Sequence, residues 1–245
     1  MIAGVSSTVK FRIASLGTAL ALIACVGLSV GAQKKPAAGS VFLQDKGKFT
    51  IKLAGQTVGH EEFEIAPSGG GWLAKGSADI KPPEGAASKV TGSLTLQSDG
   101  APMRYEWTAQ TDKSMTAHVL FANGVAKITI QVQGADPAHP FEQDLSFNTP
   151  LIAVLDNNLY YQYAVLARLY DWSKGGEQNF PVLIPQELTP GSVRVLSTGS
   201  TTADGKSYEG LKVNSSDLEI LLLLDSNHRL IRLEVPEAKV SVIRE

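Results

Sequence analysis

The chain has few of the residues that most often carry chemistry. Its 245 residues include one cysteine, Cys25, and four histidines. A lone cysteine cannot form an intramolecular disulfide, so the fold must be stabilised by its core. Beyond residue 32 there is no G-x-S-x-G elbow, phosphate-binding loop, dinucleotide glycine pattern or Cys/His metal spacing. We therefore predict a non-enzymatic protein without cofactor, metal or disulfide-linked partner.

An excess of positive charge is also missing. The formal net charge is −2, and the first 32 residues hold two bases, Lys10 and Arg12, and no acid. The remainder has 20 bases and 24 acids. Nucleic acids and anionic membrane surfaces are bound through clustered basic residues, so neither is a predicted partner. The apolar content of 43% is ordinary for a domain with a sizeable core.

The N-terminus carries the clearest signal. Lys10 and Arg12 precede the apolar stretch IASLGTALALIACVGLSVGA and the polar stretch QKKPAAGS. This order is typical of a secretory signal peptide. It predicts a signal peptide at 1–32, cleavage before Gln33 and a polar linker at 33–40. We expect an exported bacterial protein, periplasmic or secreted.

Two alternatives remain for the same segment. The letters LIAC, which end at Cys25, resemble a bacterial lipobox. Lipidation of Cys25 would make the protein an outer-envelope lipoprotein. The apolar run of about eighteen residues could also stay uncleaved as a membrane anchor.

The remaining residues, 41–245, have the pattern of a single β-rich domain. Phe49, Ile51 and Leu53 alternate with polar residues, as in a half-buried strand. Asn123-Gly124 predicts a two-residue type I′ hairpin. Further hairpin turns are predicted at 98–100, 204–205 and 225–227, and a loop at Pro82-Pro83. Such short turns join antiparallel strands, and about twelve strands are expected.

One stretch breaks the alternation. Asn148-Thr149 and Pro150 resemble a helix start, and Gly175-Gly176 a helix end. Between them runs an apolar stripe at helical spacing, formed by Ile152, Leu155, Leu159, Tyr163, Leu166 and Tyr170. Polar residues are few there: Asp156, Asn157, Arg168 and Asp171. We predict a long, mostly buried helix at about 150–174. The expected fold is mainly β: a curved antiparallel meander sheet or incomplete barrel wrapped around that helix.

The helix also supplies the candidate ligand site. It gathers four of the six tyrosines, Tyr160, Tyr161, Tyr163 and Tyr170. Tyrosines combine an apolar ring with a hydroxyl that needs a partner when buried, so they either fill a core or line an apolar cavity. The predicted ligand-binding residues are Leu159, Tyr160, Tyr163, Leu166 and Tyr170.

A second cluster has a weaker pattern. His60, Glu62 and Glu64 share one face of a predicted strand, and such a set could bind a metal ion. Phe63 and Ile65 occupy the opposite face. The favoured interpretation is therefore a solvated outer face without a metal.

The signal peptide, the meander and the buried helix together resemble the lipoprotein-carrier (LolA-like) superfamily of curved-sheet periplasmic proteins and related exported domains of unknown function. The stretches FTIKLAGQTVGHEEFEI and LLLLDSNHRLIRLEV are similar in style to those domains. The resemblance implies an incomplete barrel that holds a lipid or acyl chain.

Three functions remain open. The first is an exported binding module for an apolar or amphipathic, lipid-like ligand held between sheet and helix. The second is a structural or accessory cell-envelope domain with a fully packed core. The third is a hydrolase with a dispersed site.

Overall fold

The computed structural model describes residues 41–84, 86–111, 114–203, 205–215 and 218–245. The predicted signal peptide, linker and cleavage site, and Cys25, lie outside these ranges. Within them, no helix is long and apolar enough to cross a membrane.

The described chain is mainly β, as predicted, with fifteen strands, one α-helix and one short 3₁₀ helix. The strands are β1 (Asp45–Leu53), β2 (Gln56–Ser68), β3 (Gly71–Ile80), β4 (Ser88–Leu96), β5 (Pro102–Gln110), β6 (Ser114–Ala122), β7 (Val125–Val132), β8 (Phe141–Ser146), β9 (Ala153–Val154), β10 (Glu177–Ile184), β11 (Thr189–Ala203), β12 (Lys206–Asn214), β13 (Glu219–Leu224), β14 (Leu230–Val235) and β15 (Val240–Arg244). The helices are α1 (Tyr161–Leu169) and η1 (Pro185–Glu187).

All described strands belong to one sheet. Strands β1 to β8 form one antiparallel meander and β10 to β15 form another. The first and last strands, β1 and β15, pair antiparallel in the middle of the sheet and join the two meanders. Strands β8 and β9 are the two free edges, so the sheet is not closed.

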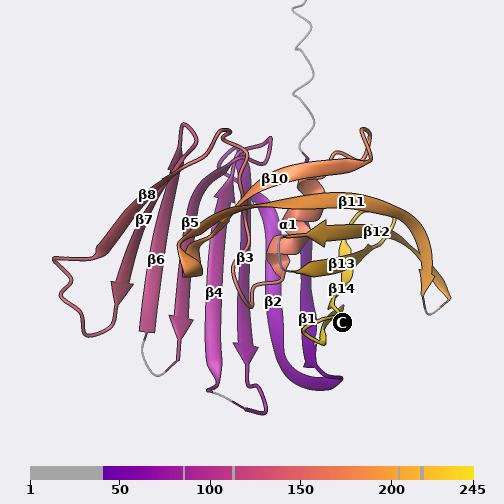
Figure 1. The fold of residues 1–245 in the computed structure, drawn as a ribbon, viewed down its shortest axis with the longest axis horizontal. Helices are drawn as coiled ribbons and strands as arrows, with labels where there is room; N and C mark the ends of the chain where they lie inside the picture. The colour runs from indigo at the N-terminus through magenta and orange to yellow at the C-terminus, as the bar shows by residue number, and fades with distance from the viewer. Residues whose placement is uncertain (1–40, 85, 112–113, 204, 216–217) are drawn as a thin grey trace, which may run out of the picture. The chain divides into compact units, whose positions relative to one another are not determined.

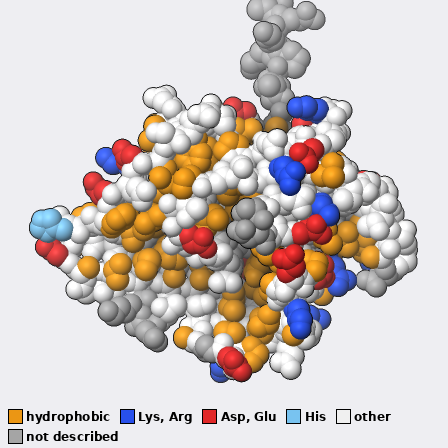
Figure 2. All heavy atoms as spheres, viewed as in Figure 1, with side chains coloured by type: hydrophobic (Ala, Val, Ile, Leu, Met, Phe, Trp, Pro, Cys, Tyr) orange, Lys and Arg blue, Asp and Glu red, His pale blue; other side chains and the backbone are white. Residues whose placement is uncertain are grey.

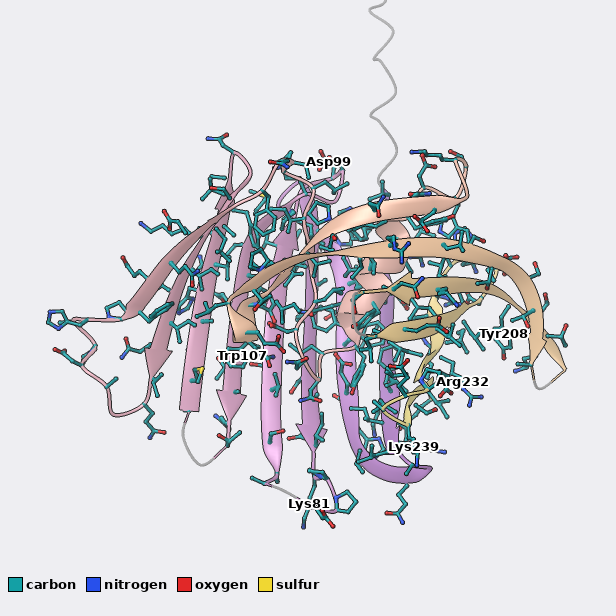
Figure 3. The ribbon with its side chains drawn as sticks, in the orientation of Figure 1. Lys81, Asp99, Trp107, Tyr208, Arg232 and Lys239 are labelled. Atoms are coloured by element: carbon teal, nitrogen blue, oxygen red, sulfur yellow. The ribbon has the colours of Figure 1, made fainter. Side chains whose placement is uncertain are left out.

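The sheet curls back over itself. In Figure 1, β10 and β11 run across β1 to β4, and α1 lies between these two sets. Contacts of α1 with β3 and β14 confirm that the helix touches both halves. In Figure 3, Asp99 in the β4–β5 turn and Lys81 after β3 mark opposite ends of the strands, as an up-and-down order requires.

The predicted turns are found where their residues are described. Ala122 pairs with Val125 around Asn123-Gly124, whose φ angles of 51° and 74° are both positive, as in a type I′ hairpin. Turns also separate β4 from β5 and β13 from β14. Ala203 pairs with Lys206, although Asp204 lies outside the described residues. The loop at Pro82-Pro83 separates β3 from β4.

Replacing Gly124 by valine should lower the free energy of unfolding by about 1–3 kcal/mol. The new side chain would need a positive φ, and its Cβ would lie 2.8 Å from the carbonyl oxygen of Phe147. Gly134→Val is the matched control, because Gly134 has a φ of 86° but nothing within 4 Å of an added Cβ. Urea unfolding should show the larger loss at Gly124. Equal losses of stability in the two variants would mean that the close approach to Phe147 adds nothing to the cost of the Gly124 substitution.

The predicted helix at about 150–174 is wrong in extent. The described segment at 150–174 forms one short α-helix, α1, of nine residues, of which seven are buried. Thr149 does accept a hydrogen bond from the Leu151 amide at 3.2 Å, as a cap would. The chain then enters the short strand β9, which pairs in parallel with β10.

Tertiary hydrogen bonds explain the shorter helix. The amide of Leu155 donates to the carbonyl oxygen of Leu183 at 3.0 Å, which continues the β9–β10 pairing. Asn158 then adopts a left-handed φ of 66°, which interrupts a right-handed helix. At the other end Tyr170 is extended, with φ −64° and ψ 124°. An apolar run that is buried on all sides suits a strand as well as a helix, so its spacing could not separate the two.

Candidate functional site

Two acidic side chains are buried beside the start of α1. Glu61 on β2 is 0% exposed and Asp156, between β9 and α1, is 4% exposed. Buried carboxyl groups are costly unless hydrogen-bonded, so they mark a place where the fold is held by specific contacts.

Glu61 caps the helix from a distant strand. Its two carboxyl oxygens accept hydrogen bonds from the backbone amides of Tyr160, at 2.9 Å, and Tyr161, at 3.2 Å. These amides belong to the first turn of α1, where N–H groups have no partner within the helix. Burial raises the pKa of Glu61 to about 8, and the two hydrogen bonds offset part of that rise.

Asp156 organises the chain on the other side of the helix start. It accepts hydrogen bonds from the Tyr105 hydroxyl at 2.6 Å and from the Gln186 amide at 2.9 Å. The side chain of Gln162 donates a hydrogen bond to the Tyr105 hydroxyl at 3.1 Å and accepts one from the backbone amide of Asp156. Burial raises the pKa of Asp156 to about 7. The network ties β5, the β9–α1 connection and η1 together.

Two glycines make room for this network. Gly76 on β3 pairs with Gly92 on β4. A Cβ added at Gly76 would lie 2.4 Å from a ring carbon of Tyr161, and one at Gly92 would lie 2.8 Å from a methyl carbon of Leu159. The helix therefore packs directly on the sheet backbone here. This arrangement positions α1 against the sheet, so we assign the two acids a structural role.

The predicted ligand residues divide into two groups. Leu159 and Leu166 are 0% exposed and Tyr170 is 2% exposed, all within the continuous core. Tyr160 and Tyr163 are partly buried and pack against that core. Burial raises the pKa of Tyr160 to about 12 and raises the pKa of Tyr163 as well. Leu159 and Tyr161, rather than a ligand, fill the space beside the two glycines.

The His60, Glu62 and Glu64 side chains lie on the outer face, as the alternation predicted. They do not gather as metal ligands. The Nδ1 atom of His60 lies 3.0 Å from a carboxyl oxygen of Glu245, and Glu64 pairs with Lys75 at 2.9 Å. Within the described ranges no group of three His, Cys, Asp or Glu residues could hold a metal ion.

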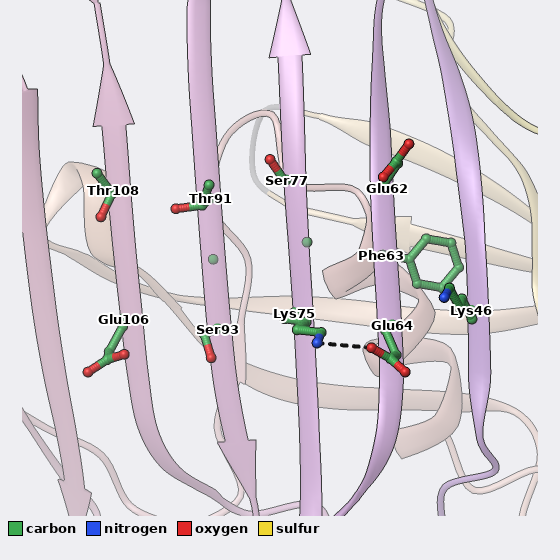
Figure 4. Close-up of a pocket in the computed structure, with 12 residues that line it drawn as sticks. Lys46, Glu62, Phe63, Glu64, Lys75, Ser77, Thr91, Ser93, Glu106 and Thr108 are labelled. Atoms are coloured by element: carbon green, nitrogen blue, oxygen red, sulfur yellow. Dashed lines mark ion pairs between the residues drawn. The ribbon is translucent and has the colours of Figure 1, made fainter.

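A groove of about 520 Å³ crosses this outer face. Figure 4 shows its side chains projecting from β1 to β5, with the Glu64–Lys75 ion pair between β2 and β3. The polar lining residues are Lys46, Glu62, Glu64, Lys75, Ser77, Thr91, Ser93, Glu106 and Thr108. They offer hydrogen-bond donors and acceptors of both charges.

The inner face is incompletely covered where the sheet stays open. The inner side chains of the edge strand β8 are Phe141, Gln143 and Leu145, and those of Met115 on β6 and Val132 on β7 lie beside them. Phe141 is 50% exposed, whereas the other four are partly buried. We call these five residues the open flank. Figure 2 shows hydrophobic side chains gathered over β5 to β8 on this side of the domain.

Sequence reasoning missed both the buried acids and the open flank. The signal for Glu61 was present, since alternation along β2 puts it on the same face as Phe63 and Ile65. Asp156 had no such signal, because it was assigned to the polar strip of the predicted helix. The open flank depends on which strand forms the sheet edge, which alternation does not specify.

Comparison with known proteins identifies the fold. A beta-barrel-like protein with the domain of unknown function DUF1849, from Brucella abortus, aligns with a TM-score of 0.54 at 9% identity, over 84% of this chain and 96% of that one. A DUF1089 family protein from Pseudomonas aeruginosa aligns with a TM-score of 0.46 at 12% identity, over 73% of this chain and 90% of that one. No family model matches the chain, and no curated protein does. The first of these likenesses supports a barrel-like fold. Neither shows the predicted LolA-like relationship.

Proposed function

We propose that the domain is an exported, non-enzymatic binding module for an apolar or amphipathic ligand, and that the open flank is its binding surface. The observation that carries the proposal is the exposure of Phe141, which is 50%, beside four further inner-face side chains that stay partly uncovered. Four of these five side chains are apolar and Gln143 adds a polar group, and uncovered apolar surface with a few polar groups commonly marks a binding site.

The flank replaces the earlier hypothesis of a ligand held between sheet and helix. At Leu159, Leu166 and Tyr161 that space is filled by side chains that are 0% exposed. A ligand could enter there only by displacing core residues. On the flank it would instead cover surface that the sheet leaves open because β8 pairs with β7 on one side and has no described strand on the other.

Binding of the apolar fluorophore N-phenyl-1-naphthylamine tests this proposal. We expect Phe141→Ser to weaken binding by about five- to tenfold, because it removes a ring that contributes on the order of 1 kcal/mol of apolar contact. The matched control is Leu120→Ser, since Leu120 is 54% exposed but lies on the outer face of β6. This variant should bind the fluorophore like the unchanged protein.

Other outcomes select among the alternatives. If Tyr163→Ala weakens binding and Phe141→Ser does not, the ligand lies between sheet and helix. Absence of binding by the unchanged protein would favour a structural or accessory envelope domain that acts through its surface.

A further inference from the structure

Strand β8 presents a free backbone edge beside the open flank. Among the described strands it is the last on its side of the sheet, and β7 is its one partner there. The amide of Phe147, just after β8, donates a hydrogen bond at 2.7 Å to the carbonyl oxygen of Gly124, just before β7. Backbone groups alternate in direction along a strand, so those of residues 141, 143 and 145 also face β7. The N–H and C=O groups of Glu142 and Asp144 therefore point outward, where a further strand would lie.

The side chains of β8 alternate as well. Phe141, Gln143 and Leu145 face inward, onto the open flank. Glu142 and Asp144 face outward and are exposed. Asp144 lies opposite Lys127 on β7, while Glu142 lies opposite the uncharged Thr129. One face of the edge thus carries two apolar side chains on either side of Gln143, and the other face is acidic.

We propose that β8 and the open flank bind an extended segment of another protein, in which apolar residues alternate with lysine or arginine, as an additional strand. This inference rests on the proposed function and specifies its ligand. Residues directly opposite each other in paired strands project to the same face. The apolar residues of the segment would meet Phe141 and Leu145, and its basic residues would meet Glu142 and Asp144.

Charge argues against a second copy of this chain as the occupant. Antiparallel pairing of two β8 strands around Gln143 would put Glu142 of one copy opposite Asp144 of the other. Like charges directly opposite each other destabilise a strand pair. A basic alternating segment converts the same two positions into attractive pairs, and its backbone satisfies the free N–H and C=O groups, which a lipid chain cannot do.

A charge-swap experiment on the full chain tests the proposal. Two fluorescein-labelled peptides, Lys-Val-Lys-Val-Lys-Val-Lys and Glu-Val-Glu-Val-Glu-Val-Glu, are titrated by fluorescence anisotropy at low salt. We expect the unchanged protein to prefer the lysine peptide by about three- to tenfold, and the double variant Glu142→Lys/Asp144→Lys to reverse that preference. Both substitutions lie on the exposed face. Asp144→Lys also places a lysine opposite Lys127, so circular dichroism and a urea midpoint check that the double variant is folded under the titration conditions. The matched control, Glu62→Lys/Glu64→Lys on β2, should keep the preference of the unchanged protein.

The outcomes separate this inference from the function on which it rests. If neither peptide binds while Phe141→Ser still weakens binding of the fluorophore, the ligand is not a strand. That result would overturn this inference and leave the proposed function intact. Equal binding of both peptides would also overturn it. A concentration-dependent dimer that Glu142→Lys/Asp144→Lys alters would identify a second copy as the occupant instead.

Discussion

Replacing Leu166 by alanine should lower the free energy of unfolding by about 2–5 kcal/mol, the cost of truncating a well-packed leucine. Leu166 is 0% exposed and lies in the middle of α1. That helix contacts β3 in one half of the sheet and β14 in the other. Tyr161 packs directly on Gly76 and Leu159 on Gly92, which holds the start of α1 against the sheet and limits how far the helix can shift to close the new cavity. Urea unfolding should show a lower midpoint at an unchanged slope.

Leu120→Ala provides the matched control for this prediction. It removes the same atoms from a leucine that is 54% exposed on β6. Its effect should stay within about 0.5 kcal/mol, as for most surface substitutions. Equal midpoints for the two variants would show that α1 is not needed to hold the two halves of the sheet together.

The β part of the fold was predictable because its signals are local. Alternation of apolar and polar residues follows from the geometry of a strand, and Asn123-Gly124 is one of the few pairs that tolerate two positive φ angles. These signals predicted about twelve antiparallel strands and a sheet that need not close. They could not show that β1 pairs with β15, because that contact joins segments about two hundred residues apart and has no local signature.

The helix was overextended for a different physical reason. Its apolar stripe includes buried residues from two kinds of structure. Ile152 and Leu155 flank the strand β9, whereas Leu166 lies within the helix α1. Polar residues on the presumed exposed side were also misassigned. Asp156 is buried in a hydrogen-bond network, and Arg168 is 9% exposed and donates to the carbonyl oxygen of Asn227. Tertiary partners decided the conformation of this segment.

The buried acids make stability depend on pH in an unusual direction. The unfolded chain loses the Glu61 proton near the ordinary pKa of 4.5, while the folded protein keeps it up to about pH 8. Between these values the folded state binds more protons than the unfolded state, so stability falls as pH rises. The loss from this residue alone should be on the order of 5 kcal/mol once pH exceeds 8. Asp156, with a pKa raised to about 7, also makes stability fall as pH rises, over a lower pH range.

Other groups act in the opposite direction and must be separated from Glu61. Hydrogen bonds and nearby charges lower the pKa of exposed Glu64, and burial lowers the pKa of His228. Both groups make the protein less stable as pH falls. The informative quantity is therefore the difference between the unchanged protein and Glu61→Gln, measured by urea unfolding from pH 5 to pH 9.

Glu61→Gln should become progressively more stable than the unchanged protein as pH rises, by about 3–5 kcal/mol between pH 5 and pH 9. Glutamine keeps an oxygen that can accept one helix amide but cannot ionise, so the cost of a buried charge disappears. Glu62→Gln is the control, because its side chain lies on the exposed outer face of the same strand. It should leave the pH dependence unchanged. Parallel curves for Glu61→Gln and the unchanged protein would mean that Glu61 ionises normally in the folded state and that the start of α1 is not closed to water.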